Sequence, residues 1–171
     1  DALRTPDAAF SGLPDYPWPP HYRQDLPALD GLRLHYVDTG PRGHAGRAWL
    51  LLHGVPFWSY AYRHMIAALA ARGQRVVAPD LPGFGKSDKP KRARAQSRAG
   101  YAQVVRELVA YLDLQRVILV GQGLGSQIAL QLLHDAPSRY AAALFLDRQP
   151  ATDGGAGEGA CPAHDAAWAA P

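Results

Sequence analysis

The chain has 171 residues, 47% of them apolar and 19% charged, a single cysteine (Cys161) and a formal net charge of +3. This length suits one domain, and the composition excludes an intrinsically disordered chain, a protein with a membrane-spanning run of roughly 20 apolar residues, and a disulfide-stabilised fold. Because the first residues also lack the basic and apolar regions of a signal peptide, we expect a cytoplasmic protein without a membrane partner.

The first 30 residues are rich in proline and aromatic residues, which predicts an extended arm packed over the core rather than a regular element. The chain does not begin with methionine, which suggests that it is trimmed or incomplete. Residues 32–37 then alternate between apolar and polar side chains, as in a half-buried strand, and residues 38–41 end it with turn chemistry. The continuous apolar run at 49–52 predicts a fully buried strand.

Helices and strands alternate through the rest of the chain. We expect helices at 59–71, 101–112 and from about 128 to 134, and strands at 75–78, 117–120 and 141–146. Gly73 is expected to stop the first helix and Pro137 to separate the last helix from the last strand. This alternation with short loops is typical of an α/β fold that has a mainly parallel sheet with helices on both faces.

Composition divides the chain into two parts. Residues 1–147 are interpreted as the folded core, with 1–30 as its N-terminal arm. Residues 148–171 are dominated by Gly, Ala and Pro and are interpreted as a loop or tail. We find no internal repeat.

Six basic residues lie between positions 86 and 98: Lys86, Lys89, Lys91, Arg92, Arg94 and Arg98. Such a cluster can bind phosphate backbones, but it has no interleaved aromatic residues. We therefore interpret it as a solvated loop and expect no nucleic-acid partner. The run Gly85-Lys86-Ser87 resembles the end of a nucleotide-binding P-loop, but Asp80 stands where that motif needs its first glycine.

The turn after the strand at 117–120 has the build of a nucleophile elbow. In the pattern GxSxG, flanking glycines allow a sharp turn that presents the middle side chain to the active site. Gly121 and Gly125 are the flanking glycines here, and Gly123 at the apex has no side chain. Ser126 is not expected to replace the nucleophile, because no base is placed to activate it and its hydroxyl is more suited to capping the helix backbone.

Further motifs are distributed from residue 3 to about residue 146. They lie at 3–7 with Phe10, 16–17, 32–38, 53–54, 58–60, 62–63, 65–66, 79–90 and 112–114. Together these residues resemble the haloalkane dehalogenase family of α/β-hydrolases. The resemblance implies an α/β-hydrolase sheet that is truncated after about the sixth strand, so that the helical cap and the last strands of the family are missing.

The resemblance also implies a chemistry that needs neither a cofactor nor a metal. In the family, an aspartate at the elbow displaces halide from a small halogenated substrate, and a histidine-activated water hydrolyses the resulting ester. The family elbow reads QDWGG, whereas this chain has Gln122-Gly123-Leu124-Gly125-Ser126. The nucleophile position is therefore occupied by Gly123. Leu124 replaces the tryptophan that steadies the leaving halide. Val55 stands where the family commonly has Glu or Asn, and an Asn there would donate a hydrogen bond to the halide, which valine cannot do.

Other parts of the family's site are present in outline only. The backbone N–H groups of Val55 and Leu124 correspond to its oxyanion hole. Asp147 follows the last predicted strand, where one branch of the family has its catalytic acid, although a polar residue that ends a strand is the simpler interpretation. The catalytic histidine of the family follows the cap, and His164 comes too early to match it.

These observations predict a dehalogenase-like chain that is catalytically inactive or a fragment. Two alternatives remain open: a non-catalytic binding scaffold, and a dinucleotide-binding module in which residues 121–126 imitate GxGxxG and Asp147 binds a ribose. If the last strands are missing, the strand at 141–146 lies at an exposed sheet edge, and we expect self-association through it. We also expect that Gly123→Asp alone gives at most stoichiometric alkylation, since no histidine base would free the ester.

Overall fold

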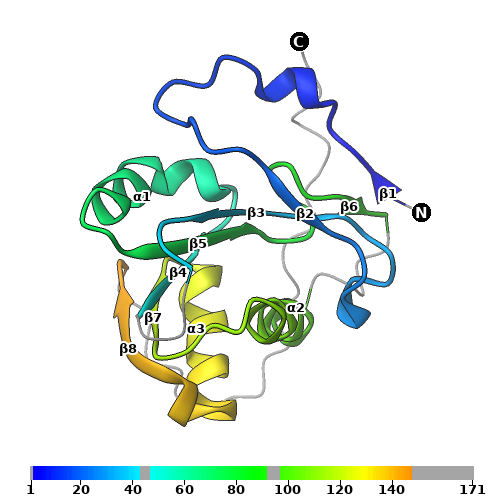
Figure 1. The fold of residues 1–171 in the computed structure, drawn as a ribbon. Helices are drawn as coiled ribbons and strands as arrows, with labels where there is room; N and C mark the ends of the chain where they lie inside the picture. Colours follow the sequence, from blue (N-terminus) through cyan, green and yellow to red (C-terminus); the bar gives the residue numbers. More distant parts are fainter. Residues whose placement is uncertain (1, 43–46, 92–96, 148–171) are drawn as a thin grey trace.

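The computed structural model describes residues 2–42, 47–91 and 97–147. Six strands form one mixed sheet in the order β2-β3-β5-β4-β7-β8 (Figure 1). These strands are β2 (His21–Arg23), β3 (Leu34–Thr39), β4 (Ala48–Leu52), β5 (Arg75–Asp80), β7 (Val117–Gly121) and β8 (Tyr140–Phe145). The pairs β5–β4, β4–β7 and β7–β8 are parallel, and β2–β3 and β3–β5 are antiparallel. The predicted α/β class with a mainly parallel sheet is confirmed.

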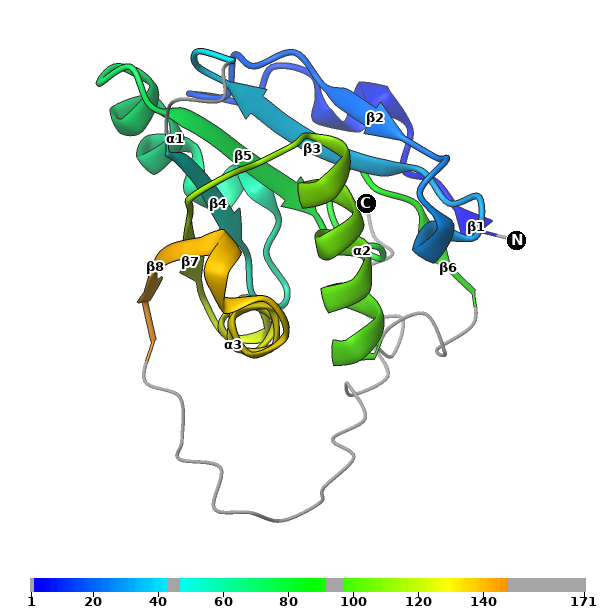
Figure 2. The same ribbon diagram turned by 60° about the horizontal axis from the view of Figure 1, so that its bottom comes forward.

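Helices cover both faces of this sheet, as expected. One face carries α1 (Arg63–Ala70), and the other carries α2 (Arg98–Tyr111) and α3 (Leu124–Asp135) (Figures 1 and 2). Short 3-10 turns complete the fold: η1 (Asp7–Phe10), η2 (Pro27–Leu29), η3 (Ser59–Tyr62), which leads into α1, and η5 (Pro137–Arg139). The tight hydrogen-bonding turn η3 accounts for the first residues of the helix predicted at 59–71.

Two apolar clusters form the core, one on each face of the sheet. Leu50 and Leu52 of β4 belong to the cluster beneath α2 and α3, whereas Leu51 belongs to the cluster beneath α1, which also contains Ile66. This division follows from the period of two along a strand. Each fully buried leucine contributes about 2 kcal/mol through loss of apolar surface from water. The buried strand predicted at 49–52 is thus confirmed.

The N-terminal arm differs from its prediction in one respect. It contains β2, which pairs with β3 and extends the main sheet by one strand, and β1 (Ala2–Leu3), which pairs with β6 (Lys89–Pro90) in a separate two-stranded sheet. The prediction of an arm without regular elements is therefore wrong. Strands of two and three residues are too short to leave a periodic signal in the sequence.

The prediction of a half-buried strand at 32–37 is also wrong, because β3 is buried on both faces. His35 and Asp38, its polar positions, are both buried. Each has a charged or polar partner: the Nδ1 of His35 is 2.8 Å from Asp80 Oδ2, and Arg75 makes two 3.0 Å hydrogen bonds to Asp38. Burial of a polar group costs much less free energy when the group has a hydrogen-bond or ion-pair partner, and these two residues have such partners.

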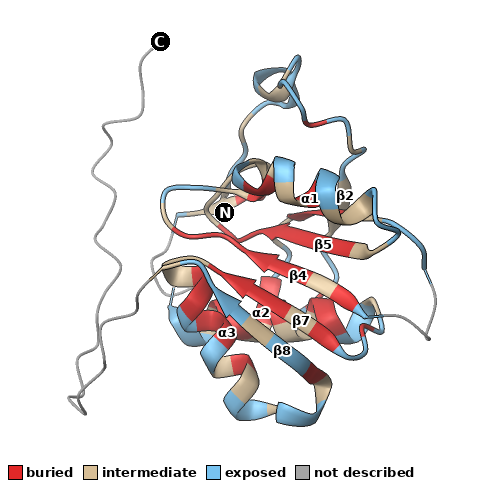
Figure 3. Ribbon diagram, turned by 90° about the vertical axis from the view of Figure 1, so that its left-hand side faces the viewer, coloured by how far each residue is buried: buried red, intermediate tan, exposed pale blue. Residues whose placement is uncertain are grey.

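The strand β8 lies at the edge of the sheet, and much of it faces solvent (Figure 3). Leu144 and Phe145 are 47% and 36% exposed, and the adjacent Leu146 is 46% exposed. Ala141 and Ala142 are exposed as well. The predicted edge position of this strand is confirmed, and it presents an uncharged, largely apolar surface.

Candidate active site

The elbow connects β7 to α3 and has the backbone of a sharp strand-to-helix turn. Gly123 has φ +53° and ψ −117° and is the N-cap of α3, which begins at Leu124, about four residues earlier than predicted. A Cβ built on Gly125 would lie 1.9 Å from the carbonyl oxygen of Leu52, and one on Gly121 would lie 2.7 Å from the backbone of Ser126. Gly125 is therefore required for α3 to approach β4 closely, and Gly121 for the first turn of α3 to pack against the end of β7.

The apex itself is less crowded than its flanks. A Cβ on Gly123 would find its nearest neighbours at 3.6 and 3.7 Å, which are ordinary van der Waals contacts. The loop after β4 packs against this turn, since a Cβ on Gly54 would lie 2.9 Å from the carbonyl oxygen of Gln122. The contact brings the segments containing Val55 and Leu124 to the same end of the sheet. Their role as an oxyanion hole stays a prediction.

Asp147 lies directly against the elbow. The backbone N–H of Gly123 donates to its Oδ2, and the hydroxyl of Ser126 donates to its Oδ1 at 2.8 Å. The expectation that Ser126 caps the helix backbone is therefore wrong, because its hydroxyl binds a carboxylate from the end of the next strand. Asp147 is thus more than a polar residue that ends a strand, because it binds two groups of the elbow. The role of Asp147 as a catalytic acid stays a prediction.

One buried polar side chain near the elbow, that of His53, is held by hydrogen bonds with the backbone. His53 is fully buried; its Nδ1 lies 2.9 Å from the carbonyl oxygen of Gly54, and its Nε2 accepts from the N–H of Leu81 at 3.0 Å. Burial lowers the pKa of His53, so the ring is neutral and both nitrogens are engaged. This geometry argues against His53 as a general base.

Sequence reasoning did not single out Tyr62 as a neighbour of the site. Its hydroxyl donates to the carbonyl oxygen of Leu52 at 3.0 Å, and burial, together with the charge of Asp147, raises the pKa of this hydroxyl. Tyr62 therefore stays protonated beside the elbow carboxylate. A tyrosine at the end of a 3-10 turn leaves no distinct sequence signal.

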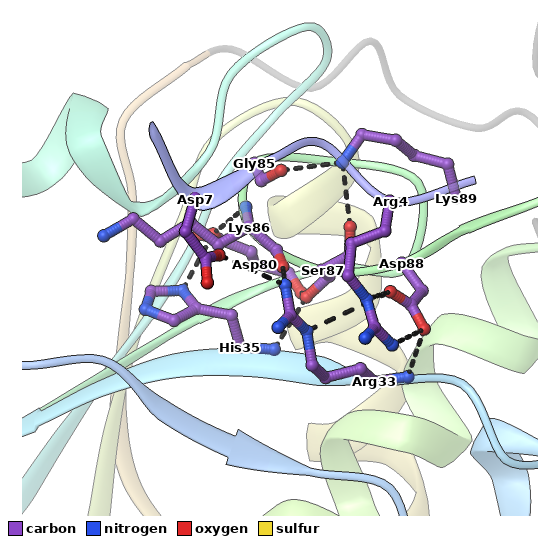
Figure 4. A network of polar contacts seen from close by, with 10 residues as sticks. All are labelled: Arg4, Asp7, Arg33, His35, Asp80, Gly85, Lys86, Ser87, Asp88 and Lys89. Carbon is purple, nitrogen blue, oxygen red and sulfur yellow. Dashed lines mark hydrogen bonds and ion pairs between the residues drawn. The ribbon is translucent and has the colours of Figure 1, made fainter. Parts of the chain in front are cut away.

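A polar network joins the N-terminal arm to the loop after β5 (Figure 4). Asp80 accepts the N–H groups of Ser59 and Lys86, each at 2.8 Å, in addition to its contact with His35. Burial alone would raise the pKa of Asp80, but the hydrogen bond and charge of His35 and the Ser59 N–H outweigh it and lower that pKa. Asp80 thus acts as a buried anionic anchor rather than an exposed reactive group.

The predicted basic cluster is partly used by the chain itself. The ammonium of Lys89 donates to the carbonyl oxygens of Gly85 and Ser87 at 2.7 and 2.8 Å. The ammonium of Lys86 lies 5.2 Å from the centre of the Tyr16 ring, within the range of a cation–π contact. In a P-loop a helix begins at the Gly-Lys-Ser run, whereas here β6 follows it and α2 begins only at Arg98. The exclusion of a P-loop is therefore confirmed. Arg92, Arg94, Cys161 and His164 lie outside the described residues.

The described residues contain neither a metal-binding cluster nor a membrane-spanning helix. None of their groups of His, Cys, Asp and Glu side chains is arranged to hold a metal ion. None of the helices in the same ranges has both the length and the apolar character needed to cross a membrane.

Residues 49–156, which include the elbow, β8 and all but the first residue of β4, match the model of the family described as "alpha/beta hydrolase fold". The chain belongs to this family. Within the α/β-hydrolases, it is 45% identical over 140 residues to a haloalkane dehalogenase of Psychrobacter cryohalolentis, which covers 81% of this chain and 46% of that protein. It is 47% identical over 141 residues to haloalkane dehalogenase 1 of Mycobacterium tuberculosis, with 82% and 47% covered. The chain spans about half the length of these relatives.

Solved structures of α/β-hydrolases give the same result. A haloalkane dehalogenase of Paraglaciecola agarilytica, described as tetrameric, superposes with a TM-score of 0.78 and 41% identity, covering 82% of this chain and 46% of that one. An epoxide hydrolase of Vigna radiata superposes with a TM-score of 0.68 and 27% identity, covering 78% and 41%. The predicted resemblance to dehalogenases is confirmed.

The dinucleotide-binding alternative is not favoured. The relatives named above are haloalkane dehalogenases and an epoxide hydrolase. In addition, Asp147, which that alternative would place on a ribose, binds the N–H of Gly123 in the loop itself. The glycines at 121 and 125 serve close packing of the elbow, which accounts for the imitation of GxGxxG.

Proposed function

We propose that this chain is a haloalkane dehalogenase-like hydrolase scaffold that does not turn over halogenated substrates by itself. The observation that carries the proposal is the apex of the elbow, where the backbone of a nucleophile turn is kept while Gly123 offers no nucleophile. Leu124 and Val55 add to this, because neither side chain can donate a hydrogen bond to a departing halide. The parent reaction is hydrolysis of a carbon–halogen bond through an alkyl-enzyme ester.

The test is halide release from small bromo- and chloroalkanes. We expect no release above the rate of the buffer alone, since nothing at the apex can displace halide. The haloalkane dehalogenase of Paraglaciecola agarilytica serves as the positive control. Multiple-turnover halide release by the unmodified chain would defeat the proposal.

Gly123→Asp extends the same test. This variant should give at most one alkyl group per chain, detected by intact mass, because neither nitrogen of His53 is free to activate water. Gly123→Asn is the matched control, since its amide has the same shape without a nucleophilic oxygen anion. Sustained turnover by Gly123→Asp would reveal a base that we have not identified.

We propose in addition that the chain self-associates through β8. Support comes from its uncharged edge and from the exposed side chains of Leu144, Phe145 and Leu146. Edge strands without charges or prolines are prone to pairing with other chains. The division into a core at 1–147 and a tail at 148–171, the absence of a nucleic-acid partner and the cytoplasmic location stay predictions.

A further inference from the structure

The outer edge of β8 can pair with a further strand. The N–H of Leu146 donates to the carbonyl oxygen of Gly121 at 2.9 Å, so the backbone of Leu146 is turned toward β7. Backbone groups along a strand point alternately to its two sides, and the register of β7 and β8 is regular from Ala142 onward. The N–H and C=O groups of Ala143 and Phe145 are therefore directed to the free edge. Among the described strands, β8 is the last of the main sheet, and its outer side has no partner there.

Two identical edge strands can pair by a closed symmetry in one direction only. A twofold axis perpendicular to the sheet sets the strand antiparallel to its copy, as in an isologous dimer. A twofold axis along the strands would make the copies parallel and set N–H opposite N–H, so that no ladder forms. With the perpendicular axis, opposite residues lie on the same face of the sheet, so the pairing is centred on one residue and its own copy.

The sequence of β8 is self-complementary in this arrangement. It places three small side chains before two large ones, namely Ala141, Ala142, Ala143, Leu144 and Phe145. When the pairing is centred on Ala143, Leu144 lies opposite Ala142 of the second copy. Phe145 lies opposite Ala141 in the same way. Because side chains directly opposite each other are about 5 Å apart at Cβ, each large side chain meets a small one and the strands can approach without a clash.

The two neighbouring registers are less favourable. Centred on Ala142, the pairing would set the apolar ring of Phe145 opposite the charged Arg139. Centred on Leu144, it would set that large side chain opposite its own copy. The register described above instead sets Arg139, which precedes β8, opposite Asp147, which follows it, and unlike charges opposite each other stabilise an antiparallel pair. Each carboxylate oxygen of Asp147 accepts one hydrogen bond within its own chain, which leaves capacity for a further donor.

We infer that β8 binds a second copy of this chain, antiparallel and with Ala143 at the twofold axis, so that the two main sheets join into one. The inference rests on the self-association proposed above and adds to it the direction, the register and the limit of two copies. In this dimer the side chains of Leu144 and Phe145, which are 47% and 36% exposed in one chain, lie against side chains of the second copy. The backbone groups of Ala143 exchange hydrogen bonds with their own copy across the axis.

The first test is disulfide cross-linking of single cysteines under mild oxidation, in a Cys161→Ser background. Ala143→Cys should cross-link two chains, because a residue on the axis lies about 5.5 Å from its own copy at Cα, within the range of a disulfide. Ala142→Cys and Leu144→Cys are the matched controls, since each would lie roughly 7–8 Å from its own copy and should not cross-link. The double variant Ala142→Cys/Leu144→Cys should cross-link, because these positions lie opposite each other. Cross-linking of either control in preference to Ala143→Cys would overturn the register.

The second test uses the unmodified chain, so that it does not depend on how a variant folds. The amides of Ala143 and Phe145 should exchange with solvent roughly tenfold more slowly at concentrations that favour the dimer than after dilution, because the pairing gives them acceptors. The amide of Leu146, which already donates to β7, is the internal control and should be protected at both concentrations. Protection of all three amides that does not change with concentration would mean that the edge is covered within one chain, and would overturn the inference.

Sedimentation of the same samples separates this inference from the proposed self-association. The expected result is a dimer that does not grow further as the concentration is raised, since an isologous pair closes on itself. Larger assemblies would overturn the twofold arrangement. Association that Leu144→Lys weakens, but without cross-linking of Ala143→Cys, would overturn the inference and retain the proposed self-association through β8. A monomer at every concentration would defeat both.

Discussion

Single residues at the elbow have separate tasks, and Gly125 has the strictest. Its hydrogen atom points at the carbonyl oxygen of Leu52, which already accepts hydrogen bonds from Tyr62 and from the backbone of Gln122. A backbone carbonyl in the centre of a sheet cannot move aside without breaking its ladder. Side-chain chemistry therefore plays no part at this position, where the only requirement is the absence of a Cβ.

We predict that Gly125→Ala destabilises the protein by about 3 kcal/mol or more, at the upper end of the cost of overpacking. Gly12→Ala is the matched control, because Gly12 has φ +69° and no atom within 4 Å of a built Cβ. That substitution should cost about 1 kcal/mol, from its backbone conformation alone. Urea unfolding measures both variants. Equal costs would show that the elbow can relax away from β4.

His53 makes stability depend on pH. Burial lowers its pKa in the folded chain, whereas an unfolded histidine has a pKa of about 6.5. The folded state therefore resists a proton that the unfolded state accepts, so the contribution to stability is complete above about pH 6.5 and is lost as the pH falls.

We predict that His53→Gln lowers the melting temperature at pH 7 but flattens its dependence on pH between 7 and 5. The loss of one such titration removes at most about 1.4 kcal/mol per pH unit. Thermal unfolding across this range measures the slope, and subtraction of the two proteins removes the contribution of other histidines. Parallel slopes would show that His53 accepts its proton in the folded state.

Among the elements, the strap formed by β1, β6 and the loop between β5 and β6 depends on Asp88. Its carboxylate receives two hydrogen bonds from the guanidinium of Arg4, at 2.7 and 2.9 Å, and one from the N–H of Arg33 at 2.9 Å. Burial would raise the pKa of Asp88, but these hydrogen bonds outweigh it and lower that pKa. Its contribution to stability is thus present above about pH 4, the ordinary range of the carboxyl, and is lost as the pH falls through the lower folded value.

We predict that Asp88→Asn costs about 1–2 kcal/mol at pH 7, because it removes hydrogen bonds to a charged group, and that the difference narrows toward pH 3. Asp25→Asn is the control, since Asp25 is 65% exposed and its ion pair with Arg23 lies at the surface. Chemical unfolding at several pH values provides the measurement. A constant difference across this range would mean that the charge of Asp88 is not what holds the strap.

Most elements could be predicted from the sequence because their side chains repeat with the period of a helix or a strand. The short β2 could not, and the start of α3 was placed too late because glycines at 123 and 125 argue against a helix on propensity alone. The elbow and its missing side chain were visible in the sequence. The contact between Gly123 and Asp147 was not, because it depends on the register of β7 and β8, which shifts between Val117 and Ile118.

At the scale of the whole molecule, the sheet is asymmetric. One edge is β2, a short strand of the N-terminal arm with partly buried residues, and the other edge is β8, which presents exposed apolar side chains (Figure 3). Three large apolar side chains in succession, at 144–146, are unusual on a solvated edge. Because the two edges differ, we expect copies of the chain to associate through the β8 edge.

We predict that sedimentation detects self-association that Leu144→Lys weakens at least tenfold, because a charge on an edge strand opposes pairing. Leu3→Lys is the control, since Leu3 is 62% exposed but lies in β1, outside the main sheet. A clean monomer at all concentrations would contradict the prediction. Equal weakening by both substitutions would point to nonspecific association instead.

The tight approach of α3 to β4 also has an evolutionary consequence. The folding requirement lies on positions 121 and 125, whereas position 123 needs only to accept a positive φ, which glycine does without strain. A glycine at the apex therefore keeps the free energy of unfolding unchanged or raises it, relative to a residue with a side chain. Cellular proteases and chaperones respond to the unfolded fraction, not to catalysis. On the proposed function, selection against unfolded protein therefore does not act on the absence of a nucleophile at position 123.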